Sequence, residues 1–271
     1  MPQNQEPVPG VDPPLRGFSG HVFSMTTPDS DPLTNGSSCL SSDELRRAEN
    51  FLRRPDAAAF IARRVFLRET LAANLDVSPH DVKLDVSPSG KPELRHGKTR
   101  LWFSQSATTG RTVVALSRNG EVGIDIERLD RRLDFGRIAN RWFTQLEICR
   151  IERCRSEETI RREFMGIWTA REAAAKLTGE GMARALPAHE SFVDPMRIAL
   201  PEGGLPICID ARVDSPYLVS VAWSAIERSS RAVTGGATKA TGYARGHVHT
   251  AERNRLGRLF SWRRVAENVR H

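Results

Sequence analysis

The spacing of hydrophobic residues changes several times along the chain, and each change predicts a different secondary structure. Between residues 41 and 75 apolar side chains recur every three or four positions, which predicts two helices. Ser41 and Glu44 form a capping-box pattern before the first helix, and Asp56 is placed to cap the second. Beyond residue 82 apolar and polar positions alternate, as they do in half-buried strands. The strands predicted in this region cover 82–86, 101–104, 112–117 and 122–127.

The second half of the chain repeats this order of helices followed by strands. Helices are predicted over 135–143, 146–155 and 157–177, and the last of them should end at Gly179. Strands are predicted over 191–200, 207–213 and 218–224. The Asn119-Gly120 pair predicts a hairpin. Because helices precede antiparallel strands in each half, we expect an α+β fold of two similar lobes, each with helices packed on a small antiparallel sheet.

Composition divides the chain into four parts. Residues 1–38 are rich in Pro, Gly, Ser, Asp and Thr and show no periodicity, so we expect them to be disordered. Residues 39–124 should form the N-terminal lobe and residues 125–226 the C-terminal lobe. Residues 227–271 are basic, and we expect a flexible tail there.

The net charge of +7 belongs entirely to this tail. It holds ten basic and three acidic residues, which leaves thirty of each sign in residues 1–226. The body of the protein is therefore neutral and gives no electrostatic argument for binding nucleic acid. The tail itself is open to three interpretations: a dispensable segment, an anchor for nucleic acid or an acidic partner, or an aid to docking.

The remaining composition indicates a soluble protein of the cytoplasm. Hydrophobic residues make up 39% and charged residues 27% of the 271 positions. No apolar run approaches the ~20 residues that a membrane-spanning helix needs, and the N-terminus does not resemble a secretory signal. The four cysteines form no C-x-x-C pair, which favours incidental thiols in a reducing compartment.

Two groups of acidic residues are candidates for chemistry. Asp125 and Glu127 lie two apart on a predicted strand, so both carboxylates project from one face. Taken alone, they are equally typical of a solvated strand face. Trp168, Glu172 and Lys176 are spaced by four on a predicted helix and form one stripe, although Glu172 and Lys176 alone could be an ordinary surface pair.

Basic and small polar residues could meet a second requirement of phosphate chemistry, which is a set of cations and hydrogen-bond donors. Lys91 lies in the Gly90-Lys91-Pro92 turn, and Ser104-Gln105-Ser106 ends a predicted strand with small hydrogen-bond donors. Three carboxylates could converge on one Mg²⁺, which prefers oxygen ligands and leaves positions open for phosphates. The lysines could neutralise the remaining phosphate charge, as a phosphoryl-transfer site requires.

The ordered motifs G-K-P, F-S-x-S, G-I-D-I-E and W-T-x-R-E-A-x-x-K resemble the 4'-phosphopantetheinyl transferase superfamily, over residues 42–225. In size, the chain resembles members of the larger, monomeric, surfactin-synthetase-activating type of this superfamily. The resemblance implies a pseudo-dimeric α+β fold that binds coenzyme A between its lobes. It also implies a Mg²⁺-dependent holo-[acyl-carrier-protein] synthase that moves phosphopantetheine from coenzyme A to a serine of an apo acyl or peptidyl carrier protein and releases adenosine 3',5'-bisphosphate. Such an enzyme would serve polyketide, nonribosomal peptide or fatty acid biosynthesis, without nucleic-acid or membrane partners.

The resemblance also assigns roles to residues. It implies that Glu172 and Lys176 are catalytic, and that Glu172 either binds the metal or takes the proton from the carrier serine. The implied metal ligands are Asp125, Glu127 and Glu172. The implied coenzyme A contacts are Arg47, Arg54, Lys91, Pro92, Ser104, Gln105 and Asp125.

The chain departs from the family pattern at two positions. Gln105 stands where the family usually has a histidine that contacts phosphate, and Ala59 stands where a basic residue is common. Arg63 or Arg64 could compensate from a nearby helical turn. These departures predict weaker coenzyme A binding, and they leave open a second hypothesis: an impaired module that binds carrier protein or coenzyme A without transfer.

Overall fold

The computed structural model describes residues 18–27, 37–88, 90–95, 101–179, 197–198 and 207–224. The helices are α1 (Ser42–Glu49), α2 (Arg54–Leu75), α3 (Phe135–Trp142), α4 (Gln145–Glu152) and α5 (Glu157–Thr178), with short 3₁₀ turns η1 (Ser37–Cys39) and η2 (Pro79–Asp81). The strands are β1 (His21–Thr26), β2 (Leu84–Val86), β3 (Pro92–Leu94), β4 (Trp102–Thr108), β5 (Arg111–Ser117), β6 (Val122–Arg128), β7 (Arg197–Ile198), β8 (Ile207–Asp214) and β9 (Tyr217–Ser224).

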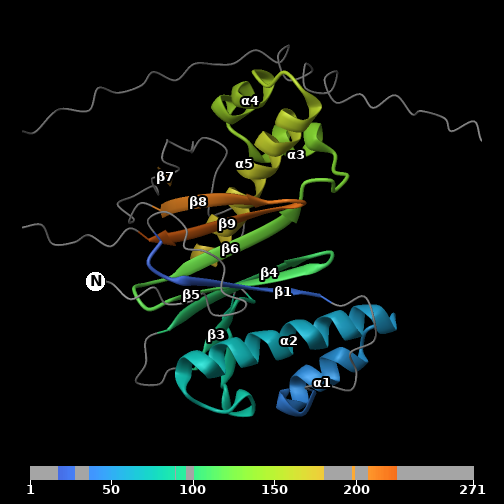
Figure 1. Cartoon of the computed structure of the whole chain (residues 1–271), viewed down its shortest axis with the longest axis vertical. Helices are drawn as coiled ribbons and strands as arrows, with labels where there is room; N and C mark the ends of the chain where they lie inside the picture. The colour runs from blue at the N-terminus through green and yellow to red at the C-terminus, as the bar shows by residue number, and fades with distance from the viewer. Residues whose placement is uncertain are drawn as a thin grey trace, which may run out of the picture.

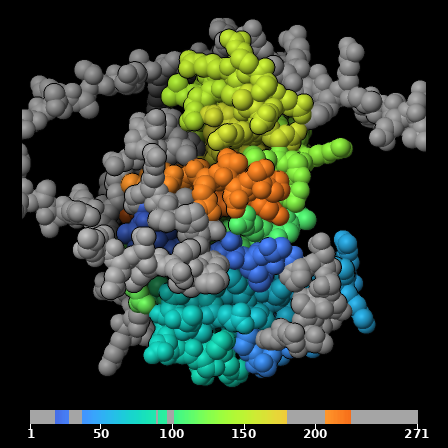
Figure 2. Space-filling view, in the orientation of Figure 1, coloured from blue at the N-terminus to red at the C-terminus, as the bar shows by residue number. Residues whose placement is uncertain are grey.

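Two antiparallel sheets lie between two sets of helices (Figure 1). One sheet has the strand order β1-β5-β4 and is covered by α2, and the other has the order β6-β9-β8-β7 and is covered by α5. The strands β2 and β3 form a separate hairpin. In the space-filling view, the surface of β8 and β9 lies between the helical block of α3 to α5 and the N-terminal half of the molecule (Figure 2). The α+β class of helices packed on small antiparallel sheets is confirmed.

The alternation of side chains along β5 explains how the layers are joined. Val114 and Leu116 point to one face and pack with Leu67 and Leu71 of α2. Val113 and Ala115 point to the other face, where they share a core with residues of β6 and β9. Both faces of β5 are therefore buried, and the two sheets share the hydrophobic cluster that lies between them.

The two sheets also meet at their edges. Both β4 and β6 are edge strands in their own sheets. The hydroxyl of Ser104 on β4 accepts a hydrogen bond from the backbone N–H of Ile124 on β6, at 3.2 Å. A small hydroxyl side chain therefore satisfies a buried backbone donor where no strand pairing is available.

Gly123 allows α5 to approach β6 closely. A Cβ atom at this position would lie 1.9 Å from the carbonyl oxygen of Ala173 and 2.6 Å from the backbone nitrogen of Leu177. Both are backbone atoms of α5 and cannot move aside as a flexible side chain could. The glycine therefore sets the distance between the helix that carries Lys176 and the strand that carries Asp125.

We expect Gly123→Ala to separate α5 from β6 and to lower the free energy of unfolding by about 1–3 kcal/mol, the usual cost of overpacking a core. Urea denaturation of the full chain would measure the loss. Gly136→Ala is the matched control, because a Cβ at residue 136 would meet only a side-chain oxygen of Asp134, at 3.8 Å. Equal stability of the two variants would contradict the argument.

Several predicted boundaries are confirmed. The capping box predicted at Ser41 with Glu44 is present, and another begins α4, at Thr144 with Glu147. The long helix α5 ends at Gly179, whose φ of 73° is in the left-handed region that glycine adopts readily. The predicted strands 207–213 and 218–224 agree with β8 and β9 within one residue.

Two of the predicted segment boundaries are wrong. The segment 1–38, expected to be disordered, contains β1, which pairs with β5, and Phe18, which packs against Trp223 with the ring centroids 5.4 Å apart. The lobe boundary at 124/125 falls inside β6, which pairs with β9 along its whole length. Both errors concern contacts between segments far apart in the sequence, because β1 pairs with β5 and β6 pairs with β9.

Two predicted local features are also wrong. Asn119-Gly120 does not form a hairpin, because β5 and β6 belong to different sheets and the pair connects them. Asp56 does not cap α2, which begins at Arg54 with Arg53 as its N-cap residue, so Asp56 lies inside the first turn.

The predicted strand 191–200 is described only at β7, and the tail 227–271 lies outside the described residues. None of the helices that the structure describes is long and apolar enough to span a membrane.

Candidate active site

The two acidic residues of β6 lie on the face of the strand that α5 covers. Ile124 and Ile126 point into the core between the sheets, so Asp125 and Glu127 point the opposite way, toward the helix. Both are buried, with exposed fractions of 5% and 7%. The alternative of a solvated strand face is therefore wrong, and the charges must be balanced by neighbours.

Lys176 provides that balance for Asp125. Its Nζ lies 2.7 Å from Oδ1 of Asp125 and donates a hydrogen bond to Oγ of Ser106 at 2.8 Å. The Ser106 hydroxyl donates to the same Oδ1, also at 2.8 Å. Three elements, β4, β6 and α5, thus meet at one carboxylate oxygen, and Lys176 pairs with Asp125 rather than with Glu172.

Each acid keeps one oxygen without a hydrogen-bond partner. Oδ2 of Asp125 and Oε2 of Glu127 are buried and accept no hydrogen bond from the residues that the structure describes. The other oxygen of Glu127, Oε1, is paired with Arg131. Unsatisfied buried carboxylate oxygens are costly, and a divalent cation with a preference for oxygen ligands would satisfy both. Asp125 and Glu127 therefore fit the chemistry of a Mg²⁺ site.

Glu172 lies close enough to Asp125 and Glu127 for their negative charges to affect its pKa. Burial raises the pKa of Glu172, and the negative charges of Asp125 and Glu127 raise it further, while Lys176 opposes them. It makes no hydrogen bond or ion pair with any residue in the described part of the chain. Within the described ranges, however, no three acidic, histidine or cysteine side chains are gathered closely enough to form a metal-binding group. The assignment of Glu172 as a third ligand stays a prediction.

A cavity of about 320 Å³ opens beside this cluster, and we call it the inner cavity. Its lining includes six residues that the sequence proposed: Lys91, Pro92, Ser104, Gln105, Glu172 and Lys176. Lys91 reaches it from the β2–β3 hairpin and donates to the carbonyl oxygen of Leu177 at 3.1 Å. Burial lowers the pKa of Lys91, and Glu121 and Glu93 partly offset this effect.

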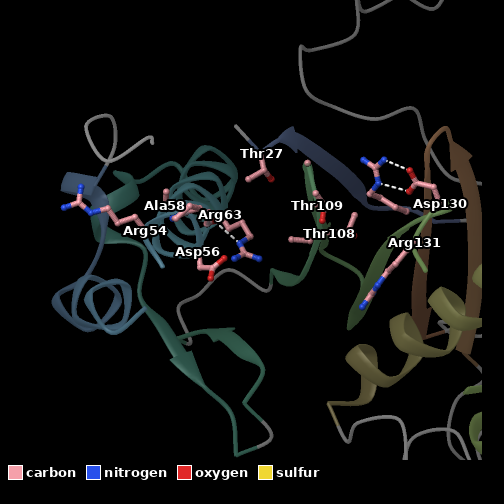
Figure 3. Close-up of a pocket in the computed structure, with 14 residues that line it drawn as sticks. Thr27, Arg54, Asp56, Ala58, Arg63, Thr108, Thr109, Asp130 and Arg131 are labelled. Carbon is pink, nitrogen blue, oxygen red and sulfur yellow. Dashed lines mark hydrogen bonds and ion pairs between the residues drawn. The ribbon is translucent and has the colours of Figure 1, made fainter. Parts of the chain in front are cut away.

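Two expected members of this site lie elsewhere. The Arg47 guanidinium stacks over the ring of Phe60, 5.4 Å from its centroid, and does not line the inner cavity. Arg54 lines a second, larger cavity of about 950 Å³, which we call the outer cavity (Figure 3). The spacing of basic residues on a helix could not distinguish these positions from that of Arg64, which does line the inner cavity.

The two departures from the family pattern have visible structural consequences. The amide of Gln105 donates to the carbonyl oxygen of Arg63 at 3.0 Å and so joins β4 to α2. Arg63 donates from Nε to the carbonyl oxygen of Ala59 at 2.9 Å, which brings a guanidinium alongside Ala59. Arg64 and Arg63 thus supply positive charge near the two positions where the family pattern is broken.

Sequence reasoning missed the roles of Arg131 and Gly123 in this site, and it did not predict the partners of Ser106. Ser106 binds both Asp125 and Lys176, Arg131 pairs with Glu127, and Gly123 brings their elements together. The serine and the glycine belong to motifs that had been recognised. The pairing of Arg131 depends on how the chain folds back after β6, so no motif pointed to it.

Comparisons with known proteins agree with this geometry. The family model of the 4'-phosphopantetheinyl transferase superfamily matches residues 121–222. The 4'-phosphopantetheinyl transferase HetI of Nostoc is 35% identical over 177 residues, which cover 64% of this chain and 74% of HetI. The chain belongs to the 4'-phosphopantetheinyl transferase superfamily.

Two further relatives support the membership. The putative 4'-phosphopantetheinyl transferase slr0495 of Synechocystis is 29% identical over 211 residues, which cover 72% of this chain and 84% of slr0495. The 4'-phosphopantetheinyl transferase AcpT of Salmonella typhi is 34% identical over 122 residues, which cover 45% of this chain and 59% of AcpT. Asp125, Glu127, Glu172 and Lys176 all lie inside the range that the superfamily model matches, whereas Lys91 and Gln105 precede it.

Proposed function

We propose that this chain transfers 4'-phosphopantetheine from coenzyme A to a serine of an apo acyl or peptidyl carrier protein, in a Mg²⁺-dependent reaction. The observation that carries the proposal is the contact of Lys176 with Asp125 and Ser106 at the edge of the inner cavity, with Glu172 beside it. This arrangement combines a cation for phosphate, acidic groups for a metal and a free carboxylate. Membership in the superfamily supports the same reaction.

The inner cavity would hold the diphosphate of coenzyme A. Lys91, Arg64 and Lys176 line it and offer three cationic donors to phosphate oxygens. Gln105 contributes a neutral amide where the family usually has histidine. This amide already donates a hydrogen bond to the backbone carbonyl oxygen of Arg63. We therefore attribute most of the phosphate binding to the three cations.

Asp125 and Glu127 would hold the Mg²⁺ ion through their unsatisfied oxygens, with Glu172 as a third ligand or as a base. A bound Mg²⁺ supplies neutralisation of diphosphate charge and orientation of the transferred group. Lys176 is already oriented by Asp125 and Ser106, so its ammonium group needs little rearrangement to meet a phosphate.

Glu172 is the group that we assign to the acceptor proton. It lines the inner cavity, and no described residue engages its carboxylate. Glu172, directly or through a water, takes the proton from the carrier serine while the serine oxygen bonds to the β-phosphorus. The bond from that phosphorus to the bridging oxygen breaks, and adenosine 3',5'-bisphosphate leaves with the electron pair. Lys176 lies within reach of the charge that develops there.

The assembly of the site supports action as a monomer. Ser106, Asp125 and Lys176 come from three elements of the same chain, so a second copy is not needed to complete the cluster. The assignment to polyketide, nonribosomal peptide or fatty acid biosynthesis in the cytoplasm belongs to the same proposal and follows from the carrier class.

Intact-mass spectrometry tests the function directly. Incubation of the full chain with coenzyme A, Mg²⁺ and a panel of apo carrier proteins should add the mass of one phosphopantetheinyl group to a carrier, and chelation of Mg²⁺ should prevent it. Failure of every carrier to gain mass would contradict the transferase. Binding of a carrier without a mass change would instead favour the impaired module, which the departures at Ala59 and Gln105 suggest.

A further inference from the structure

Helix α2 reaches the wall of the inner cavity through Arg64, whereas the preceding residue, Arg63, lines the outer cavity. The side chain of Arg64 is only 15% exposed. Burial lowers the pKa of Arg64, and the positive charges of Arg47, Arg68 and Arg63 lower it further. A cation in such a place costs free energy unless a negative charge lies close to it.

Glu44 supplies that negative charge from α1, the helix that packs beside α2 (Figure 1). Its Oε1 lies 3.7 Å from Nε of Arg64, and its side chain is 11% exposed. The charge of Glu44 opposes the fall in the pKa of Arg64. One ion pair thus connects α1, which does not itself line the inner cavity, to the wall of that cavity.

The other oxygen of Glu44 fixes the carboxylate in place. Oε2 accepts a hydrogen bond from the backbone N–H of Ser41 at 2.9 Å, in the capping box, and another from Nε of Arg68 at 2.8 Å. Arg68 is itself held, because it donates to the carbonyl oxygens of Pro79 and Val82, both at 3.0 Å. The two oxygens of Glu44 therefore have different partners, and Oε1 is the one nearest the arginine of the cavity.

An aromatic ring restrains the same guanidinium. Phe60 precedes Arg64 by one turn of α2, and Cζ of Arg64 lies 5.6 Å from the centre of its ring, within the range of a cation–π contact. Phe60 is buried and packs against Phe51, with the ring centroids 5.4 Å apart. The ring and the carboxylate of Glu44 together define where the guanidinium lies.

Arg64 differs from the two lysines of the inner cavity in how its donors are used. Lys91 donates to the carbonyl oxygen of Leu177, and Lys176 is bound to Asp125. At 3.7 Å the contact of Arg64 with Glu44 is too long for a hydrogen bond, and its guanidinium makes none with any residue that the structure describes. Its planar set of N–H groups can therefore bind two phosphate oxygens at once.

We propose that Glu44 is a positioning residue for the donor, which holds Arg64 at the wall of the inner cavity in the orientation that binds the diphosphate of coenzyme A. This inference rests on the proposed function, because it takes coenzyme A to occupy the inner cavity. Glu44 acts through Arg64 and does not bind the donor itself. The capping box of α1 thereby serves donor binding as well as the stability of the helix.

Glu44→Gln separates these two roles. Glutamine is compatible with a capping box, and its carbonyl oxygen in the place of Oε2 can still accept from Ser41 and Arg68. Its uncharged amide group would then face Arg64. In steady-state kinetics of the full chain, we expect the KM for coenzyme A to rise about fivefold, with kcat and the KM for an apo carrier protein within about twofold of the wild type.

Arg64→Ala should raise the KM for coenzyme A at least as much as Glu44→Gln does. In the double variant, Glu44→Gln should add nothing further, because the group that it positions is gone. An unchanged KM for coenzyme A in Arg64→Ala would overturn the inference even if Glu44→Gln failed to fold. Additive effects of the two substitutions would also overturn it.

Two control variants separate positioning from stability and from net charge. Ser41→Ala removes the hydroxyl that accepts from the backbone N–H of Glu44, so it should lower the temperature of unfolding and leave the KM for coenzyme A unchanged. Glu49→Gln removes the same charge at an exposed position of α1. Loss of a negative charge by itself favours an anionic donor, so a lowered KM in Glu44→Gln, or a rise that Ser41→Ala reproduces, would contradict positioning.

Calorimetry with coenzyme A in the absence of a carrier distinguishes this inference from the proposed function. Weaker binding by Glu44→Gln than by the wild type supports the positioning role, even if no carrier is modified and the transferase proposal fails. Equal binding by the two proteins contradicts the positioning role and leaves the transferase proposal intact. If the wild type does not bind coenzyme A at all, both proposals are wrong.

Discussion

Replacement of Glu172 by glutamine is expected to abolish transfer to a carrier protein, with a loss in kcat on the order of a thousandfold. The substitution preserves the size of the side chain and its place at the inner cavity, but an amide can neither accept the acceptor proton nor bind a metal with full charge. Single-turnover assays with saturating coenzyme A and Mg²⁺ would measure the effect.

The control for this variant is Glu158→Gln, which makes the same change at an exposed position of α5. It should leave transfer unaltered. Thermal denaturation should show Glu172→Gln to be folded, and at least as stable as the wild type, because the negative charges of Asp125 and Glu127 oppose the ionisation of Glu172. Turnover by Glu172→Gln within about tenfold of the wild type would exclude Glu172 as either base or essential ligand.

Local sequence signals predicted those parts of the site that depend on one element at a time. The two-residue period of a strand placed Asp125 and Glu127 on one face, and the four-residue spacing of a helix placed Glu172 and Lys176 together. The structure agrees on both points. The fold class followed in the same way, from the order of helical and strand periodicities.

The parts that could not be predicted depend on contacts between distant segments. The strand β1 is ordered by β5, about 90 positions along the chain. Its sequence, HVFSMT, contains residues that favour strands, but it lies in a segment that is otherwise rich in Pro, Gly, Ser, Asp and Thr. A surface pair of Lys176 with Glu172 on the same helix was one alternative, but Gly123 brings β6 so close that Asp125 is the partner of Lys176. The close approach of α5 and β6 decides which acid pairs with Lys176. The spacing of residues within one helix cannot reveal this approach.

At Ala59 and Gln105 the family motif is altered, but neighbouring arginines keep positive charge close to both positions. Arg63 donates to the carbonyl oxygen of Ala59 and so places its guanidinium one turn back along α2. Arg64 lines the inner cavity together with Gln105. Because phosphate binding depends on the position of charge rather than on the residue that carries it, the altered motif does not by itself predict an inactive protein.

The second large effect is expected at a buried ion pair that supports Glu172. Arg171, its neighbour on α5, forms hydrogen bonds to both oxygens of Glu147, and both side chains are only 1% exposed. Glu147 also accepts hydrogen bonds from the backbone and the hydroxyl of Thr144, in the capping box of α4. The pair therefore fixes α4 against α5 one residue from the catalytic candidate.

Arg171→Met should lower the free energy of unfolding by about 3–5 kcal/mol, because it leaves the Glu147 carboxylate buried without a cation. Adding Glu147→Gln should recover most of this loss, since glutamine is neutral and its amide oxygen can still accept from Thr144. Arg150→Met is the matched control: Arg150 joins α4 to Glu163 of α5 in a more exposed pair, worth at most about 1 kcal/mol. Urea denaturation of the four proteins would decide, and similar losses for Arg171→Met and Arg150→Met would show that burial does not govern this contact.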